Sequence, residues 1–134
     1  MFIERLQSYT ALPTSHVTYL GNLYGFSSTT NTEVRSRFYE LALLDPLAPG
    51  VQVFAKAAAK WVTGSDGTGI IKGRMKFCRP VFRAVYRVDP SVARDEFVKY
   101  KLAFHPIARR LIEKVVYTFQ LANSLNLITY SLYC

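Results

Sequence analysis

The sequence has few of the residues that bind metals or form disulfides. Its 134 residues include two histidines, His16 and His105, and two cysteines, Cys78 and Cys134. A His-Glu-x-x-His motif, with which many peptidases bind zinc and activate water, is absent. Two cysteines are also too few for a disulfide framework. We therefore expect no cofactor, no metal site and no catalytic residue in this chain, and no turnover by the chain alone.

The first residues also lack the pattern of a secretory leader, so we expect none. The segment Met1–Leu6 carries charges at Glu4 and Arg5, and no long apolar run follows it. A signal peptide would need such a run, so this start predicts a helix instead. Together with the low cysteine count, this leads us to expect a reducing, cytoplasmic setting.

Acidic residues are scarce in one segment of the chain. Residues 72–114 contain twelve Lys or Arg and four Asp or Glu, so this segment carries the whole net charge of +8. Such an excess predicts an anionic partner or substrate. We do not expect nucleic acid to be that partner, because the sequence has no recognised nucleic-acid-binding motif and no Gly- or Arg-rich tail.

Charge is absent from the last twenty residues, Val115–Cys134. A segment of this length could span a bilayer. Polar residues such as Gln120, Asn123 and Asn126 interrupt it, however, and its Thr, Tyr and Val residues favour a strand over a helix. We therefore expect no membrane span here, but an aggregation-prone tail.

No segment shows the sustained apolar and polar alternation of a half-buried strand; apolar residues recur instead at spacings of three and four. The pattern predicts an all-α fold of about seven helices, in antiparallel pairs stacked as a right-handed superhelix of the armadillo or HEAT kind. The stripes expected to face the core are Phe2, Leu6 and Tyr9; Val17, Leu20 and Tyr24; Val34, Phe38 and Leu41; Phe54, Ala58 and Trp61; Cys78, Phe82 and Val85; Ala93, Phe97, Tyr100 and Phe104; and Ile107, Leu111 and Val115.

Capping residues mark several expected helix ends. Gly25 stands where a left-handed residue would end the second helix. Thr30, with Glu33 three residues later, fits a capping box at the start of the third. Asp89 followed by Pro90 predicts another helix start.

Residues 70–88 are expected to be helical except near Gly73. In this interpretation Pro80 lies in the first turn of a helix that starts near Cys78, where a proline is tolerated. Cys78 itself falls on an apolar face, which favours a buried and unreactive thiol. His105, just before Pro106, is expected to pack or to cap a helix end.

Four cations, Lys72, Arg74, Lys76 and Arg79, fall within eight residues. Arg74 and Lys76 are two positions apart, so in an irregular approach to a helix they point the same way, whereas in a regular helix they would not share a face. An Arg fork and a mobile Lys charge aimed at one point suit a carboxylate. The alternative is a solvated basic turn, and composition alone does not separate the two.

Several separated motifs resemble one known family. They are Tyr24-Gly25-Phe26, residues 31–38 (Asn-Thr-Glu-Val-Arg-Ser-Arg-Phe), Gly73-Arg74-Met75-Lys76-Phe77, Arg79-Pro80 and Phe104-His105-Pro106. In this order they resemble the C-terminal helical domain of the leukotriene A4 hydrolase and aminopeptidase family of zinc metallopeptidases. The resemblance covers about residues 1–114. It implies a domain 1–114 followed by a divergent, uncharged tail, 115–134.

The resemblance also implies a function. In the family the zinc site lies in a separate catalytic domain, and the helical domain closes one side of the substrate channel. The family's Gly-Arg-x-Lys pattern matches Arg74 and Lys76, which implies that they bind the carboxylate of a peptide or lipid substrate, with Met75 between them. Two alternatives remain: a free-standing helical-repeat adaptor that binds an acidic protein partner, and nonspecific nucleic-acid binding.

Overall fold

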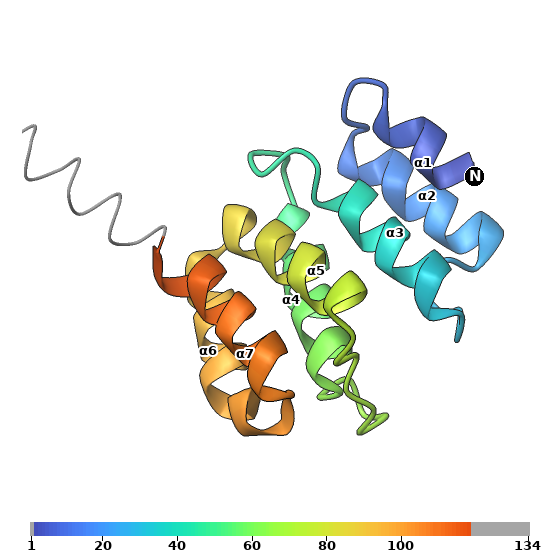
Figure 1. Cartoon of the computed structure of the whole chain (residues 1–134). Helices are drawn as coiled ribbons and strands as arrows, with labels where there is room; N and C mark the ends of the chain where they lie inside the picture. The colour runs from blue at the N-terminus through green and yellow to red at the C-terminus, as the bar shows by residue number, and fades with distance from the viewer. Residues whose placement is uncertain (1, 119–134) are drawn as a thin grey trace, which may run out of the picture.

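The computed structural model describes residues 2–118, and every regular element in that range is helical. Seven α-helices and two short irregular helices follow one another along the chain (Figure 1). They are α1 (Phe2–Gln7), α2 (Thr14–Tyr24), α3 (Thr32–Ala42), α4 (Val51–Thr63), α5 (Met75–Val88), α6 (Pro90–Tyr100), the 3-10 helix η1 (Lys101–Ala103), α7 (Pro106–Glu113) and the π-helix η2 (Lys114–Thr118). The all-α prediction and its number of helices are confirmed.

The helices pack in two layers. Helices α1, α3, α5 and α7 contact one another in that order, while α4 and α6 contact each other and both pack against α5 (Figure 1). Helix α2 packs on α3 at the end near the N-terminus. This arrangement agrees with stacked helix pairs; the right-handed superhelix stays a prediction.

Aromatic side chains fill the core around α5. Phe82 is fully buried, and its ring lies edge-on to Phe97 at 6.1 Å and to Phe104 at 6.0 Å between centroids. In α3 the fully buried Phe38 has the same role, and its ring lies edge-on to Phe54 at 6.0 Å between centroids. Edge-to-face contacts of this kind add to the free energy gained by burying the rings.

The predicted helix ends are partly correct. Gly25 has φ 68°, the left-handed conformation expected after α2. Asp89 caps α6, since its carboxylate accepts hydrogen bonds from the backbone N–H groups of Ser91 and Val92 at 3.1 and 3.3 Å. The capping box at Thr30 is wrong: the cap of α3 is Asn31, whose side chain accepts from the N–H groups of Glu33 and Val34.

Four predicted inward positions are wrong, among them Tyr24 at the end of α2, which is 56% exposed. Helix α1 buries Ile3 and leaves Phe2 and Tyr9 exposed, because the helix ends at Gln7. Helix α7 buries Ala108 and Ile112 and turns Ile107 to the surface. In α1 and α7 the predicted apolar stripe lies one position away from the buried stripe. Short helices leave this choice open, because two neighbouring stripes fit the spacing equally well.

Pro80 lies inside a helix and not in its first turn. Helix α5 begins at Met75, two residues after Gly73, so Pro80 is the sixth helical residue. Residues 70–73, expected to be partly helical, are irregular. Proline has no N–H, so the carbonyl of Lys76 has no helical donor from position 80.

The core continues past the predicted domain boundary. Val115 and Val116 are buried with the residues of α5 and α7. The division at residue 114 stays a prediction, and the expectations for the tail concern mostly residues 119–134, which lie outside the described residues. No helix within residues 2–118 has the length and hydropathy needed to cross a bilayer.

The cap of α6 gives a pH-dependent prediction. Hydrogen bonds from the Ser91 hydroxyl and the backbone lower the pKa of Asp89 below its ordinary value of 3.8. A carboxylate with a lowered pKa stabilises the fold above its unfolded pKa, and this stabilisation is lost as the pH falls through the folded pKa. We expect Asp89→Ala to lower the free energy of unfolding by about 1 kcal/mol at pH 7. The difference from the wild type should shrink below about pH 4.

Thermal unfolding followed by circular dichroism at pH 7 and pH 3 measures this difference. Asp95→Ala, which removes the same charge from an exposed position of α6, is the matched control. A loss for Asp89→Ala that is equally large at both pH values would contradict the capping role.

A second prediction concerns Val115 and Val116. Burial of each valine contributes about 1.5–3 kcal/mol. A chain that ends at residue 114 should therefore be about 3–6 kcal/mol less stable than one that ends at residue 118. Urea unfolding of the two truncated chains compares them, and equal midpoints would place the boundary of the folded unit at residue 114.

Candidate functional site

An irregular loop carries the cationic stretch from α4 to α5. Gly64 ends α4 with φ 78°, and a Cβ there would lie 2.8 Å from the backbone nitrogen of Ile70, so only glycine fits. The loop then returns to α4, where the backbone N–H of Lys72 donates to the carbonyl of Val62 at 2.9 Å. This hydrogen bond fixes the position of Lys72, from which Gly73 and Arg74 lead into α5.

Lys72 is held against α4 and is not part of the exposed group of cations. Its ammonium lies 5.4 Å from the centre of the Trp61 ring and donates to the carbonyl of Ile70 at 2.8 Å. Partial burial lowers the pKa of Lys72. Its role is therefore to anchor the loop beside the aromatic ring.

Arg74 is the N-cap of α5, the residue just before its first helical residue, Met75. Its backbone is extended there (φ −67°, ψ 130°), and its carbonyl accepts from the N–H groups of Phe77 and Cys78 at 2.9 and 3.0 Å. The Cys78 thiol is buried, as predicted, with its sulfur 3.8 Å from the carbonyl oxygen of Gly73. Burial raises the pKa of this thiol. No side chain caps the helix start, and its first turn contains no acidic residue.

The three predicted site residues lie together at this helix start. The Arg74 guanidinium and the Lys76 ammonium each lie 5.8 Å from the centre of the Phe77 ring. The backbone bends between them, because Arg74 precedes the helix and Lys76 belongs to its first turn. Met75 lies between the two cations with an exposed side chain.

The two cations differ in their partners. The Lys76 ammonium forms an ion pair with Glu33 in the first turn of α3. The hydrogen bond from Lys76 holds the pKa of Glu33 below its ordinary value of 4.5, and Arg37 and Arg74 act in the same direction. Arg74 has no carboxylate oxygen within 4 Å among residues 2–118, so its charge is available to an added anion.

Two surface hollows meet at Arg74. The first, of about 460 Å³, lies between the starts of α5 and α7; its lining is Gly73, Arg74, Met75, Lys76, His105, Ile107 and Ala108. The second, of about 420 Å³, lies between α3 and the loop before α5; its lining is Asn31, Thr32, Glu33, Ile70, Ile71, Lys72, Gly73, Arg74 and Phe77. Arg74 therefore forms the ridge between them and can reach a ligand in either.

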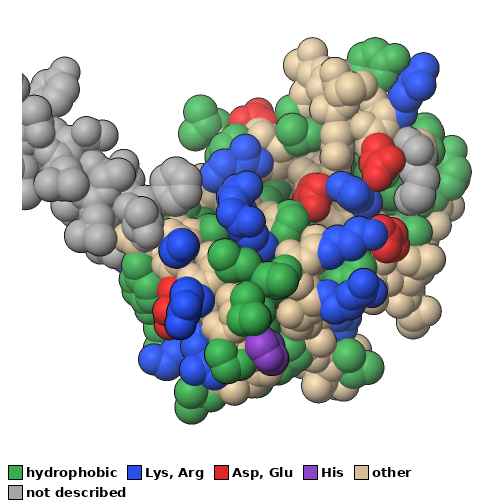
Figure 2. Space-filling model, viewed as in Figure 1, with side chains coloured by type: hydrophobic (Ala, Val, Ile, Leu, Met, Phe, Trp, Pro, Cys, Tyr) green, Lys and Arg blue, Asp and Glu red, His purple; other side chains and the backbone are tan. Residues whose placement is uncertain are grey.

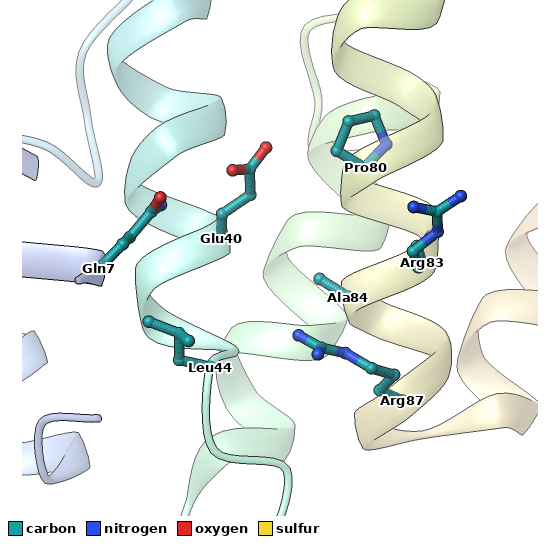
Figure 3. Close-up of a pocket in the computed structure, with 7 residues that line it drawn as sticks. All are labelled: Gln7, Glu40, Leu44, Pro80, Arg83, Ala84 and Arg87. Atoms are coloured by element: carbon teal, nitrogen blue, oxygen red, sulfur yellow. The ribbon is translucent and has the colours of Figure 1, made fainter. Parts of the chain in front are cut away.

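A third hollow is a weaker candidate for an anion. It has a volume of about 340 Å³ and is lined by Gln7, Glu40, Leu44, Pro80, Arg83, Ala84 and Arg87. Figure 3 shows Glu40 on α3 projecting toward α5, with Arg83 and Arg87 on the opposite wall. The Glu40 carboxylate would repel an anion here, whereas no acidic residue lines the hollow between α5 and α7.

The described residues do not form a metal centre. His16 lies in α2, and His105 is the cap of α7, where its Nδ1 accepts from the N–H of Ile107 at 3.3 Å. The capping role predicted for His105 is confirmed. Within residues 2–118 no three His, Cys, Asp or Glu side chains stand close enough to hold a metal ion. The resemblance places zinc in a separate catalytic domain, and the donors within residues 2–118 do not form a site for it.

The sequence patterns did not identify two residues that line the hollows beside Arg74. Glu33 was expected in the capping box of its helix, and Ile107 was expected in the core. Both reach the site through contacts between helices far apart in the chain, for which a single sequence carries no periodic signal.

A comparison with known families matches residues 1–116 to the family described as leukotriene A4 hydrolase, C-terminal. The chain belongs to this family. The match spans every helix that surrounds Arg74 and Lys76, so the resemblance seen in the sequence motifs is confirmed. The free-standing adaptor is not favoured by this result.

Curated relatives agree with the assignment to the leukotriene A4 hydrolase C-terminal family. The chain is 37% identical over 117 residues to leucine aminopeptidase 2 of Emericella nidulans, which covers 85% of the chain and 17% of the relative. Leucine aminopeptidase 2 of Phaeosphaeria nodorum is 34% identical over 115 residues, with the same two coverages. The chain thus spans about one sixth of the length of these relatives. No solved structure matches it.

The ion pair beside Arg74 gives a prediction for this domain. Because Lys76 lowers the pKa of Glu33, we expect Lys76→Gln to raise that pKa toward 4.5, as measured by a carbon-detected NMR titration of the Glu33 carboxyl group. Lys99→Gln, which removes an exposed cation from α6, should leave the titration unchanged. An unchanged pKa in Lys76→Gln would mean that the pair does not form in solution.

Proposed function

We propose that this chain is the substrate-recognition domain of an aminopeptidase of the leukotriene A4 hydrolase type. In this proposal it closes one side of the substrate channel and binds the carboxylate of a peptide or lipid substrate through Arg74 and Lys76. A separate catalytic domain, the expected partner, supplies the zinc chemistry. The cytoplasmic setting stays a prediction.

One observation supports the anchor above the others: two cations stand at the uncapped start of α5. The N-terminus of a helix carries a partial positive charge, so Arg74 and Lys76 destabilise it there, where acidic residues are normally favoured. A bound carboxylate would compensate for this repulsion. It could also accept hydrogen bonds from the planar Arg74 fork.

The anchor needs an enclosed channel to be effective. An exposed ion pair contributes little in water, because solvent screens it. A charge-assisted hydrogen bond in a site shielded from solvent contributes about 1.5–3 kcal/mol. The relatives, named as leucine aminopeptidases, are about six times longer than the matched segment, which leaves ample chain to form such a channel.

The test replaces the matched C-terminal segment of the Emericella nidulans enzyme by this chain and then substitutes Arg74. We expect Arg74→Ala to lower kcat/KM about ten- to more than one-hundred-fold for peptides with a free C-terminal carboxylate. Arg74→Lys should restore only part of the loss, because a point charge cannot replace a two-pronged contact. Lys76→Ala should have a smaller effect, because Lys76 already pairs with Glu33.

The control is a set of substrates with an amidated C-terminus, which offer no carboxylate. Their kcat/KM should change much less in Arg74→Ala. If both kinds of substrate lose equally, Arg74 holds the domain interface together, and its role in recognition has to be abandoned.

A further inference from the structure

The hollow between α5 and α7 combines charge with exposed apolar surface. Arg74 and Lys76 provide the cations, and Met75, Ile107 and Ala108 provide the apolar wall. Met75 is 46% exposed and Ile107 is 58% exposed, so about half of each residue is open to solvent. On the face shown in Figure 2, hydrophobic side chains gather among the Lys and Arg side chains over α5 and α7.

Exposure of Ile107 is a property of the helix and not of a loose end. Ala108 and Ile112 take the core positions of α7, which leaves Ile107 facing the start of α5. Three hydrogen bonds hold the segment around Ile107, residues 101–109. His105 accepts from the N–H of Ile107, and the Arg109 guanidinium donates to the carbonyls of Lys101 at 2.9 Å and Phe104 at 3.3 Å. The part of the apolar wall formed by Ile107 is thus held in place before any ligand binds.

We infer that this hollow is a specificity subsite that selects carboxylates bearing an apolar side chain next to the charged group. The inference rests on the proposed anchor at Arg74. Met75 lines the same hollow as Arg74 and Lys76, so the carbon atoms next to a carboxylate held by Arg74 can contact it. A side chain of leucine size then extends toward Ile107.

The chemistry distinguishes ligand classes. Each methylene group removed from water strengthens binding about four-fold, so a leucine side chain that is half covered gains about five- to twenty-fold over glycine. An acidic or amide side chain would lose hydration on this wall without regaining hydrogen bonds. A Lys or Arg side chain would in addition meet the positive charges of Arg74 and Lys76.

The test uses the full chain and two simple probes, N-acetylleucine and N-acetylglycine. NMR titrations follow the methyl groups of Met75 and Ile107 and the side-chain N–H of Arg74. We expect N-acetylleucine to shift all three signals and to bind about five- to twenty-fold more tightly than N-acetylglycine. N-acetylleucinamide, which lacks the charge, should bind more weakly than N-acetylleucine.

Variants separate the two parts of the site. The double variant Met75→Ser, Ile107→Ser should bind N-acetylleucine and N-acetylglycine with equal affinity. Arg74→Gln should weaken the binding of both probes. The matched control, Val53→Ser with Val98→Ser, removes exposed apolar side chains from α4 and α6 and should keep the preference for N-acetylleucine.

The outcomes distinguish this inference from the anchor. If both carboxylates shift the Arg74 signal and bind with equal affinity, the apolar subsite is wrong and the anchor stands. If the control pair abolishes the preference as fully as the Met75 and Ile107 pair does, the subsite is again wrong. If neither carboxylate shifts the Arg74 signal, the subsite is wrong, whereas the anchor is decided separately by the kcat/KM comparison in the assembled enzyme.

Discussion

The packing of α5 is the constraint on which the remaining structure depends. Helices α3, α4, α6 and α7 all contact it, and Phe82 on its buried side meets rings from two later segments of the chain. Residues inside such a close-packed core have little freedom to shift. The start of α5 is therefore positioned by contacts with the whole domain, although Arg74 itself is exposed.

Local sequence signals located the helices but not always their buried faces. The predictions for Val17, Phe38, Phe82 and Phe97 are correct, because each lies in a helix long enough for its apolar spacing to define one face. The prediction for Ile107 is wrong, because α7 has eight residues and two apolar stripes of similar quality. In such a helix the choice is made by tertiary contacts, which the spacing does not encode.

The same distinction applies to the site. Arg74, Met75 and Lys76 are adjacent in the chain, so a motif could identify them together. The ion pair with Glu33 spans more than forty residues of sequence, and the wall at Ile107 is contributed by a helix that begins after α6. Charge alone could not reveal that Lys76 is partly neutralised while Arg74 is not. That difference follows from how α3 and α5 approach each other.

Pro80 has a further consequence for the first turn of α5. Because position 80 offers no N–H, the helical ladder lacks the bond that would tie the carbonyl of Lys76 to the next turn. The turn that carries both cations is thus joined to the buried helix by fewer hydrogen bonds than the turns that follow. Segments with fewer such bonds open at a lower free energy than the fold as a whole. The first turn of α5 can then open locally, while the aromatic core beneath it stays closed.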